Sequence, residues 1–409
     1  MKKIVIVRAI ILLTSAFCFL GACKKPNHVD DETDSTRLHI VWSKPFLDEN
    51  TFAVMQDPVI VDGYVLFAGY QESIGSALTN RINIFDKTNG EGHPHPAWGG
   101  GITDNLGHEI REILIGGSNN DIIFYSTSQS LQAFSIDFRQ HLWTSVYDKS
   151  YNSFATGRIS RLGTDIIIPN FGTSFIGEIH RYNFSTGQKT TLFSFDDVVK
   201  TIQWATNEQN DTLLFFSNGW KTVYCYNLTQ DSIVWENTLN FDHSESTSHS
   251  PIILENKYVL FQHSYKISCV DFSTGKLIWD VVAISTGNCP ILYYEGKVIV
   301  RPNYGNITCY DVRNGDLLWT SSDFKLSLNS SREYGKMDAY KGNLYFTTGG
   351  TWESSLYCIS LSTGSVNWFD AGPTDRGIYG GLAIDQQTGY LYCHSLWSVM
   401  CVDLNKTPK

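Results

Sequence analysis

Cysteine and histidine are the residue types in this chain whose spacing could most readily reveal chemistry. The chain has nine cysteines in 409 residues, but no two are adjacent and no C-x-x-C-H haem-attachment motif occurs. His93 and His95 stand in E-G-H-P-H-P-A-W, and two histidines without a third ligand are more typical of a surface loop than of a metal site. No G-x-S-x-G, P-loop or dinucleotide-binding fingerprint is present. We therefore expect no catalytic residues, no metal and no cofactor.

Composition and charge exclude two classes of protein. Hydrophobic residues make up 42% of the chain and charged residues 18%, which is a globular profile. The net charge is −10 without basic blocks, whereas nucleic-acid binding requires clustered Lys and Arg. After the N-terminus, no apolar run approaches the roughly 20 residues that span a bilayer. We therefore expect neither a nucleic-acid-binding protein nor a polytopic membrane protein.

The N-terminus has the layout of a secretory signal. Lys2, Lys3 and Arg8 precede an apolar run that extends from Ala9 to Leu20. The run ends in L-G-A-C at residues 20–23, which resembles the lipobox of bacterial lipoproteins. The resemblance implies removal of residues 1–22 and lipidation of Cys23. The alternative is an ordinary signal peptide that happens to contain this cysteine.

Residues 23–36 are expected to form a lipidated, flexible, acidic tether. The stretch N-H-V-D-D-E-T-D-S-T is polar and aperiodic. Lys24 and Lys25 stand where lipoproteins retained in the inner membrane typically carry Asp. The lipoprotein resemblance therefore favours the outer membrane, and the sequence does not decide between its periplasmic and cell-surface leaflets.

A repeat organises the chain from residue 37 onward. The recurring pattern is a strand, then Asp, Asn or Ser, then Gly four residues later and Trp eight residues later, and one of its cleanest copies is C-V-D-F-S-T-G-K-L-I-W from Cys269 to Trp279. The Asp, Asn or Ser side chain can accept hydrogen bonds from the amides that follow and so set a turn. The copies recur roughly every 45 residues, with this residue at Asp86, Ser135, Asn183, Asn227, Asp271, Asp311, Ser360 and Asp403.

The other repeat positions have physical roles of their own. Gly supplies the positive φ of a tight turn, and Trp is expected to cover the neighbouring unit. Five cysteines share the position two before the turn residue: Cys225, Cys269, Cys309, Cys358 and Cys401. Because Ala133 fills the same position in the second copy, we expect buried structural thiols rather than disulfides.

Four strands per unit, repeated eight times, predict an all-β, eight-bladed β-propeller over residues 37–405. The eighth unit has no Trp strand of its own, whereas R-L-H-I-V-W-S at residues 37–43 precedes the first unit. We expect this N-terminal strand to complete the last blade, which also removes an open sheet edge. The alternative is a seven-bladed ring with frayed ends.

The run D-x-S-T-G-K-x-x-W resembles the repeat of pyrroloquinoline-quinone (PQQ)-type propellers. That superfamily includes quinoprotein alcohol dehydrogenases and the propeller lipoprotein of the outer-membrane β-barrel assembly machine. The resemblance implies the fold and leaves the function open, because the same ring serves enzymes and scaffolds. A dehydrogenase of this kind would need a vicinal Cys-Cys pair, which the chain lacks.

The longer connections predict a binding face. Second-to-third turns and connections between blades share one face of a propeller, and the long ones occupy 69–80, 240–250, 322–336 and 369–381. Candidate binding residues on this face are Trp220, Trp352, Trp397, Arg332 and Arg376. The alternative is that each Trp packs over its own blade.

These observations favour a non-catalytic, lipid-anchored protein of the cell envelope that acts as a protein-binding scaffold. Help in assembling outer-membrane proteins is the most concrete form that the resemblance implies. We expect a monomer whose partners are envelope proteins and whose membrane contact is the lipid anchor alone. Two alternatives are a surface glycan-binding lipoprotein and a PQQ-dependent dehydrogenase-like enzyme.

Overall fold

The computed structural model places the repeats in one compact unit, Thr36–Lys409. The residues that the structure describes are 37–46, 51–53, 57–72, 78–92, 112–117, 120–126, 130–136, 140–147, 159–171, 177–195, 199, 201–218, 221–239, 250–262, 266–282, 290–302, 306–321, 335–348, 355–370, 372, 377–395 and 397–407. Their secondary structure is all strand and turn.

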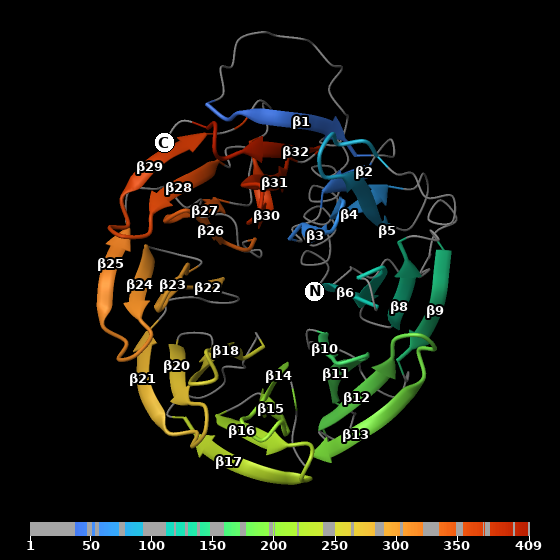
Figure 1. Cartoon of the computed structure of the whole chain (residues 1–409), viewed down its shortest axis with the longest axis vertical. Helices are drawn as coiled ribbons and strands as arrows, with labels where there is room; N and C mark the ends of the chain where they lie inside the picture. Colours follow the sequence, from blue (N-terminus) through green and yellow to red (C-terminus); the bar gives the residue numbers. More distant parts are fainter. Residues whose placement is uncertain are drawn as a thin grey trace, which may run out of the picture. The chain divides into compact units, whose positions relative to one another are not determined.

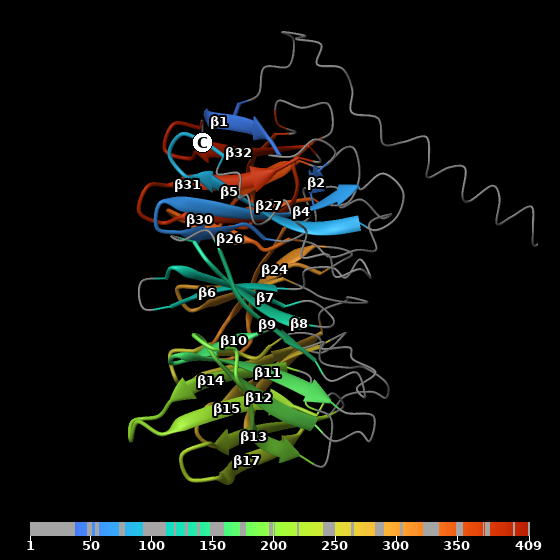
Figure 2. The same ribbon diagram turned by 90° about the vertical axis from the view of Figure 1, so that its right-hand side faces the viewer.

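Eight four-stranded antiparallel sheets form the blades of a ring, which Figure 1 shows face-on and Figure 2 edge-on. Blade 2 consists of β6 (Glu112–Gly116), β7 (Ile122–Ser126), β8 (Ser130–Ser135) and β9 (Gln140–Val146). Blade 3 consists of β10 (Ser160–Leu162), β11 (Asp165–Phe171), β12 (Gly177–Asn183) and β13 (Lys189–Phe195). Blade 4 consists of β14 (Thr201–Thr206), β15 (Thr212–Ser217), β16 (Thr222–Asn227) and β17 (Ser232–Thr238). Blade 5 consists of β18 (Ile252–Leu254), β19 (Tyr258–Gln262), β20 (Lys266–Asp271) and β21 (Leu277–Val282). Blade 6 consists of β22 (Ile291–Tyr294), β23 (Lys297–Val300), β24 (Ile307–Asp311) and β25 (Leu317–Ser321). Blade 7 consists of β26 (Asp338–Tyr340), β27 (Asn343–Thr347), β28 (Leu356–Ser360) and β29 (Val366–Asp370). The eight-bladed propeller predicted from the repeat is confirmed.

Blade 8 closes the ring as expected. Its strands are β30 (Tyr379–Asp385), β31 (Tyr390–His394), β32 (Ser398–Asp403) and the N-terminal β1 (Ile40–Pro45), in the order β1-β32-β31-β30. Because β1 continues along the chain into blade 1, its pairing with β32 joins the first blade to the last (Figure 1). The predicted role of the orphan strand is therefore confirmed.

Blade 1 differs from the predicted blade. Its sheet consists of β2 (Thr51–Ala53), β3 (Val59–Val61), β4 (Tyr64–Glu72) and β5 (Leu78–Asp86), in which β2 and β3 both pair with β4. Most of the segment 69–80, expected to be a loop, therefore continues β4 and β5, and β2 pairs with the extension of β4 from Gly69 to Gln71. The fourth strand that the repeat predicts after Asp86 lies outside the described residues.

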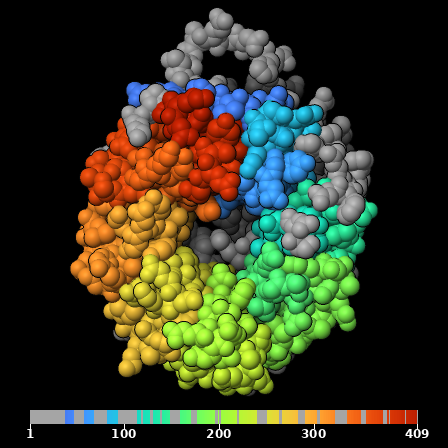
Figure 3. Space-filling view, viewed as in Figure 1, coloured from blue at the N-terminus to red at the C-terminus, as the bar shows by residue number. Residues whose placement is uncertain are grey.

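The core of the ring lies between neighbouring blades. In blade 4 the second strand, β15, is buried from Leu213 to Ser217, whereas the outer strand β17 buries Trp235 and leaves most of its other residues exposed. Residues of adjacent blades share each core cluster; Leu260 of blade 5, for example, packs with Val298 and Val300 of blade 6. The stacked blades surround a central hollow (Figure 3). Burial between blades explains why the second strands read as continuous apolar runs.

Among the described residues, a hydrogen bond from tryptophan links one blade to the next at five interfaces. The indole Nε1–H donates to the carbonyl oxygen of the residue after the repeat's turn residue, and the ring lies against the turn glycine of that next blade. A Cβ on Gly315, for example, would stand 2.8 Å from Trp279 Cγ. The pairs and their N–O distances are Trp42–Lys87 (3.2 Å), Trp143–Phe184 (2.7 Å), Trp235–Phe272 (3.0 Å), Trp279–Val312 (2.7 Å) and Trp319–Leu361 (2.9 Å).

A β-bulge precedes each of these tryptophans. Trp279 pairs with Cys269 and Leu277 with Val270, so that Ile278 is an extra residue on the outer strand. A bulge increases the local twist and turns the ladder of an edge strand away from regular pairing. The same register shift leaves Val41, Leu142, Val234, Leu318 and Asn367 as extra residues before their tryptophans, and Leu192 before Phe193.

Candidate functional site

The predicted binding face lies largely outside the part of the chain that the structure describes. Trp220, Trp352, Arg332 and Arg376 all fall outside it, as do the predicted lipidation site Cys23 and the His93–His95 pair. Their predicted roles stay predictions. Of the five candidate binding residues, only Trp397 is described.

Trp397 lies in the turn between β31 and β32, beside the N-terminal strand. It is half-buried, its backbone N–H donates to Ser395 Oγ at 3.4 Å, and its carbonyl oxygen accepts the N–H of Phe46 at 3.2 Å. Ser395 and Ser398 join their hydroxyls at 2.7 Å and close the turn. The turn therefore holds Trp397 in a fixed place beside the seam where the ring closes.

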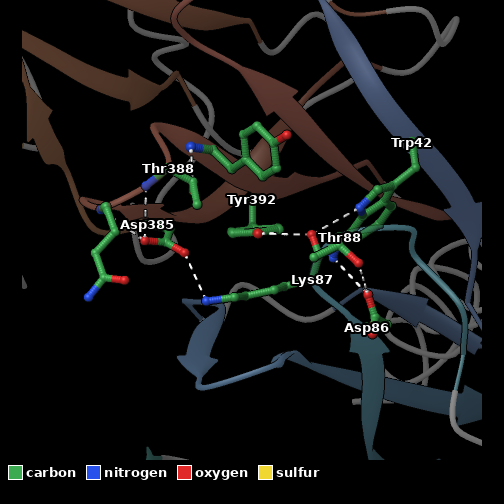
Figure 4. A network of polar contacts seen from close by, with 9 residues as sticks. Trp42, Asp86, Lys87, Thr88, Asp385, Thr388 and Tyr392 are labelled. Atoms are coloured by element: carbon green, nitrogen blue, oxygen red, sulfur yellow. Dashed lines mark hydrogen bonds and ion pairs between the residues drawn. The ribbon is translucent and has the colours of Figure 1, made fainter.

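The seam between blades 8 and 1 is built around the backbone of Lys87. Its carbonyl oxygen accepts the indole N–H of Trp42 at 3.2 Å and the hydroxyl of Tyr392 at 3.0 Å (Figure 4). Its ammonium group reaches Asp385 Oδ2 at 3.0 Å. The preceding residue, Asp86, sets the turn by accepting the N–H of Thr88 at 2.8 Å. One residue thus connects the N-terminal strand, blade 8 and blade 1.

The carboxylate of Asp385 is held in its ionised form. Burial favours the neutral acid, but the hydrogen bond from Lys87 and the amides of Gln387 and Thr388 outweigh that effect and lower the pKa of Asp385 below its ordinary value. The side chain of Asp385 is only 7% exposed and that of Lys87 22%. The pair is therefore shielded from solvent and stabilises the seam more than a surface ion pair would.

A second closure joins three blades near the ring centre. Asp57, ahead of β3, accepts the backbone N–H of Lys336 at 2.7 Å, ahead of β26. Between them β30 is bulged at Gly380 and Gly381, where a Cβ on Gly381 would meet Asp57 Oδ1 at 2.0 Å. Blades 1 and 7 thus touch across the inner strand of blade 8. Sequence analysis missed this contact, although the dipeptide Gly380-Gly381 inside a strand pattern could have indicated a close backbone approach.

The described thiols do not fit the vicinal disulfide of a quinoprotein dehydrogenase. Six cysteines are free and buried: Cys225, Cys269, Cys309, Cys358, Cys393 and Cys401. Burial raises the pKa of Cys225, Cys269, Cys309 and Cys401 to about 12, so these groups stay neutral. The prediction of buried structural thiols is confirmed for the five repeat positions, and Cys393 on β31 is free and buried as well.

Two further kinds of feature are absent from the described residues. Within those ranges no group of three or more His, Cys, Asp or Glu side chains is placed to hold a metal ion. Nor does any helix there have the length and apolar character needed to cross a membrane.

Comparison with known proteins gives a partial sequence match. A family model of PQQ-type repeats, described as outer membrane protein assembly factor BamB, matches residues 218–379. BamB of Legionella pneumophila (strain Paris) is 28% identical over 155 residues, covering 36% of this chain and 39% of the relative. The sequence match thus covers well under half of either protein.

Solved structures match over most of the ring. BamB from Moraxella catarrhalis has a TM-score of 0.59 at 13% identity and covers 90% of this chain and 100% of its own. Quinohemoprotein alcohol dehydrogenase from Comamonas testosteroni has a TM-score of 0.64 at 11% identity and covers 90% of this chain and 76% of its own. At these identities the matches establish the fold alone. The chain is an eight-bladed propeller, and its residues 218–379 resemble the PQQ-type repeats of the outer membrane protein assembly factor BamB.

Proposed function

We propose that this protein is a non-catalytic scaffold of the cell envelope, which binds other envelope proteins during the assembly of outer-membrane proteins. The observation that carries the proposal is the match of residues 218–379 to the BamB family model. The ring is consistent with a scaffold, because tryptophan hydrogen bonds join neighbouring blades and two sets of contacts close the ring. The turns and connections that would bind partners therefore project from a rigid framework.

The proposal includes a lipid anchor at Cys23. Residues 24–36 would then tether the anchored end to β1, which is fixed in blade 8 by its pairing with β32. The anchor is tested by the Cys23→Ser variant, which we expect to move from the membrane fraction to the soluble envelope fraction. A variant that stays with the membrane would contradict the lipid anchor and leave the binding function to its own test.

In-cell crosslinking of the tagged, full-length protein tests the scaffold, with captured partners identified by mass spectrometry. We expect proteins of the outer-membrane assembly pathway, and lower levels of outer-membrane barrels in cells that lack the protein. A variant with Trp220, Trp352 and Trp397 all replaced by Ala tests the predicted face, with its folding checked by thermal unfolding. Normal barrel levels together with no captured envelope protein would overturn the scaffold proposal.

A further inference from the structure

Exposed apolar side chains are concentrated on the outer strands of four consecutive blades. Nine large hydrophobic side chains stand out as exposed among the described residues, and eight of them lie on β17, β21, β25 and β29; the ninth is Val146 on β9. We call these eight the apolar rim: Ile233, Val234, Leu277, Ile278, Val282, Leu317, Leu318 and Phe369.

The apolar rim repeats with the blades. Blades 4, 5 and 6 each present two aliphatic residues just before the tryptophan that contacts the next blade. In blade 3, the outer strand β13 carries no large hydrophobic residue of this exposure. Clusters of exposed apolar residues on one side of a soluble domain mark interaction surfaces, whereas single ones need no explanation.

At one end of the rim, Phe369 is the exposed member of a stack of rings. The residue is 58% exposed. Its ring stacks on that of Tyr357 with centroids 5.2 Å apart, and Tyr357 stacks on Phe346 at 5.4 Å. The buried guanidinium of Arg301, from blade 6, lies 5.2 Å from the Phe346 ring centroid. The stack fixes the orientation of Phe369 before anything binds, which reduces the entropy cost of a contact there.

The shape of the rim decides what can occupy it. Eight blades divide the circle into steps of about 45°, so four consecutive outer strands cover a convex arc of about 135°. A flat bilayer or the flat face of a folded domain touches only a part of such an arc. An extended polypeptide can follow all of it, as the outer strands do around the ring in Figure 1.

Two further features restrict the contact. Val234, Ile278 and Leu318 are the bulged residues, so the edge strands do not offer a regular ladder for strand addition. The exposed charges beside the apolar pairs are mostly acidic, because Asp231, Glu236, Asp280 and Asp316 accompany Lys276 and Arg313. Lys266 lies 2.9 Å from Asp280 and offsets that one carboxylate. The rim therefore suits side-chain contacts with a segment that also carries Lys or Arg.

We propose that the apolar rim binds an extended segment of an envelope protein, with spaced aliphatic or aromatic side chains and basic residues between them. The proposal rests on the scaffold function and names the kind of partner that the scaffold holds. The segment lies along blades 4 to 7 and contacts Phe369 at one end.

Site-specific photo-crosslinking in cells tests this inference on the full-length protein. A photoreactive amino acid is placed singly at Val234, Ile278, Leu318 and Phe369, with exposed Ser194 on β13 as the control position. We expect the four rim positions to capture the same protein, at sites that follow one another along its sequence in blade order. Capture of a protein is supporting only with that ordered pattern.

The mapped segment, made as a synthetic peptide, provides the second measurement. We expect Leu277→Ser with Leu317→Ser to weaken peptide binding to the purified protein by about tenfold or more, and Ser194→Ala to leave it unchanged. Added salt should weaken binding as well. Capture from one blade only, capture of a second copy of this chain, or co-sedimentation with lipid vesicles in place of peptide binding would each overturn the rim proposal. Recovery of assembly proteins through other positions would still support the scaffold.

Discussion

Trp42, on the first strand of the chain, donates its indole N–H to the backbone carbonyl oxygen of Lys87 over 3.2 Å. The bond is the same in kind as the Trp319–Leu361 bond within the ring. The seam between the ends of the chain is therefore built like the other blade interfaces. The seam has two further contacts. The Tyr392 hydroxyl donates to the same Lys87 carbonyl oxygen, and Lys87 forms an ion pair with Asp385.

Because of this difference, we expect the same Trp→Phe substitution to lower the free energy of unfolding by different amounts at the two interfaces. Trp319→Phe removes the N–H that the Leu361 carbonyl accepts, and we expect the free energy of unfolding to fall by about 1–2 kcal/mol. Trp42→Phe leaves the Tyr392 hydroxyl on the Lys87 carbonyl, so we expect about half that loss. Urea unfolding of both variants measures the two values. A larger loss for Trp42→Phe would contradict the role assigned to Tyr392.

Comparing two glycines distinguishes the effect of backbone strain on stability from the effect of the contact with tryptophan. Gly315 (φ +73°) and Gly296 (φ +77°) are both left-handed, but a Cβ on Gly315 would lie 2.8 Å from Trp279 Cγ, whereas nothing lies within 4 Å of one on Gly296. We expect Gly296→Ala to cost about 1–2 kcal/mol from φ alone. Gly315→Ala should cost about 1–3 kcal/mol more, because the buried ring must move. If urea unfolding showed the same loss of unfolding free energy for both variants, the Trp279 ring would be able to move aside without destabilising the protein.

Much of the fold could be predicted because each repeat carries its own turn chemistry. Asp271 accepts the amides of Ser273 and Thr274 at 3.1 and 2.8 Å, and Asn183 serves the third blade in the same way. Such local hydrogen bonds can be predicted without knowing which distant residues are in contact. The closing strand could be predicted too, since a surplus strand at one end matched a missing strand at the other.

The β-bulges and the convergence at Asp57 could not be predicted in this way. A bulge adds one residue before the tryptophan without changing the residue types that mark the strand, so the spacing to Trp279 looks regular. The contact of Asp57 with Lys336 joins residues 279 positions apart, and only the closed ring brings them together. The binding face also depends on turns whose residue types vary from blade to blade, so the repeat itself carries no information about them.

The Lys87–Asp385 pair gives the seam a predictable pH dependence. The folded pKa of Asp385 is below its ordinary value of 3.8, which applies to the unfolded chain. The folded state therefore gains stability above that ordinary value and loses it as pH falls through the folded pKa. We expect Lys87→Met to lower the free energy of unfolding by about 1–3 kcal/mol at pH 7. The gap from the unmodified protein should shrink below about pH 4.

Lys257→Met is the matched control for that experiment. Lys257 Nζ lies 3.8 Å from Glu255 Oε2, and both side chains are largely exposed. An exposed pair contributes little, so we expect almost no change in stability at either pH. A constant gap between Lys87→Met and the unmodified protein from pH 7 to pH 3 would show that Asp385 does not need Lys87 to stay ionised.

The shared cysteine position predicts a distinction between alanine and serine. Cys225 is fully buried and burial raises its pKa to about 12, so alkylation at pH 8 should modify it only after unfolding in urea. Since blade 2 has buried Ala133 at this position, we expect Cys225→Ala to cost only about 1 kcal/mol. Cys225→Ser places a hydroxyl against Phe215 and Trp235 and should cost about 1–3 kcal/mol more. Mass spectrometry of alkylated protein and urea unfolding measure both effects, and a serine variant as stable as the alanine variant would mean that a polar group is accommodated between blades 4 and 5.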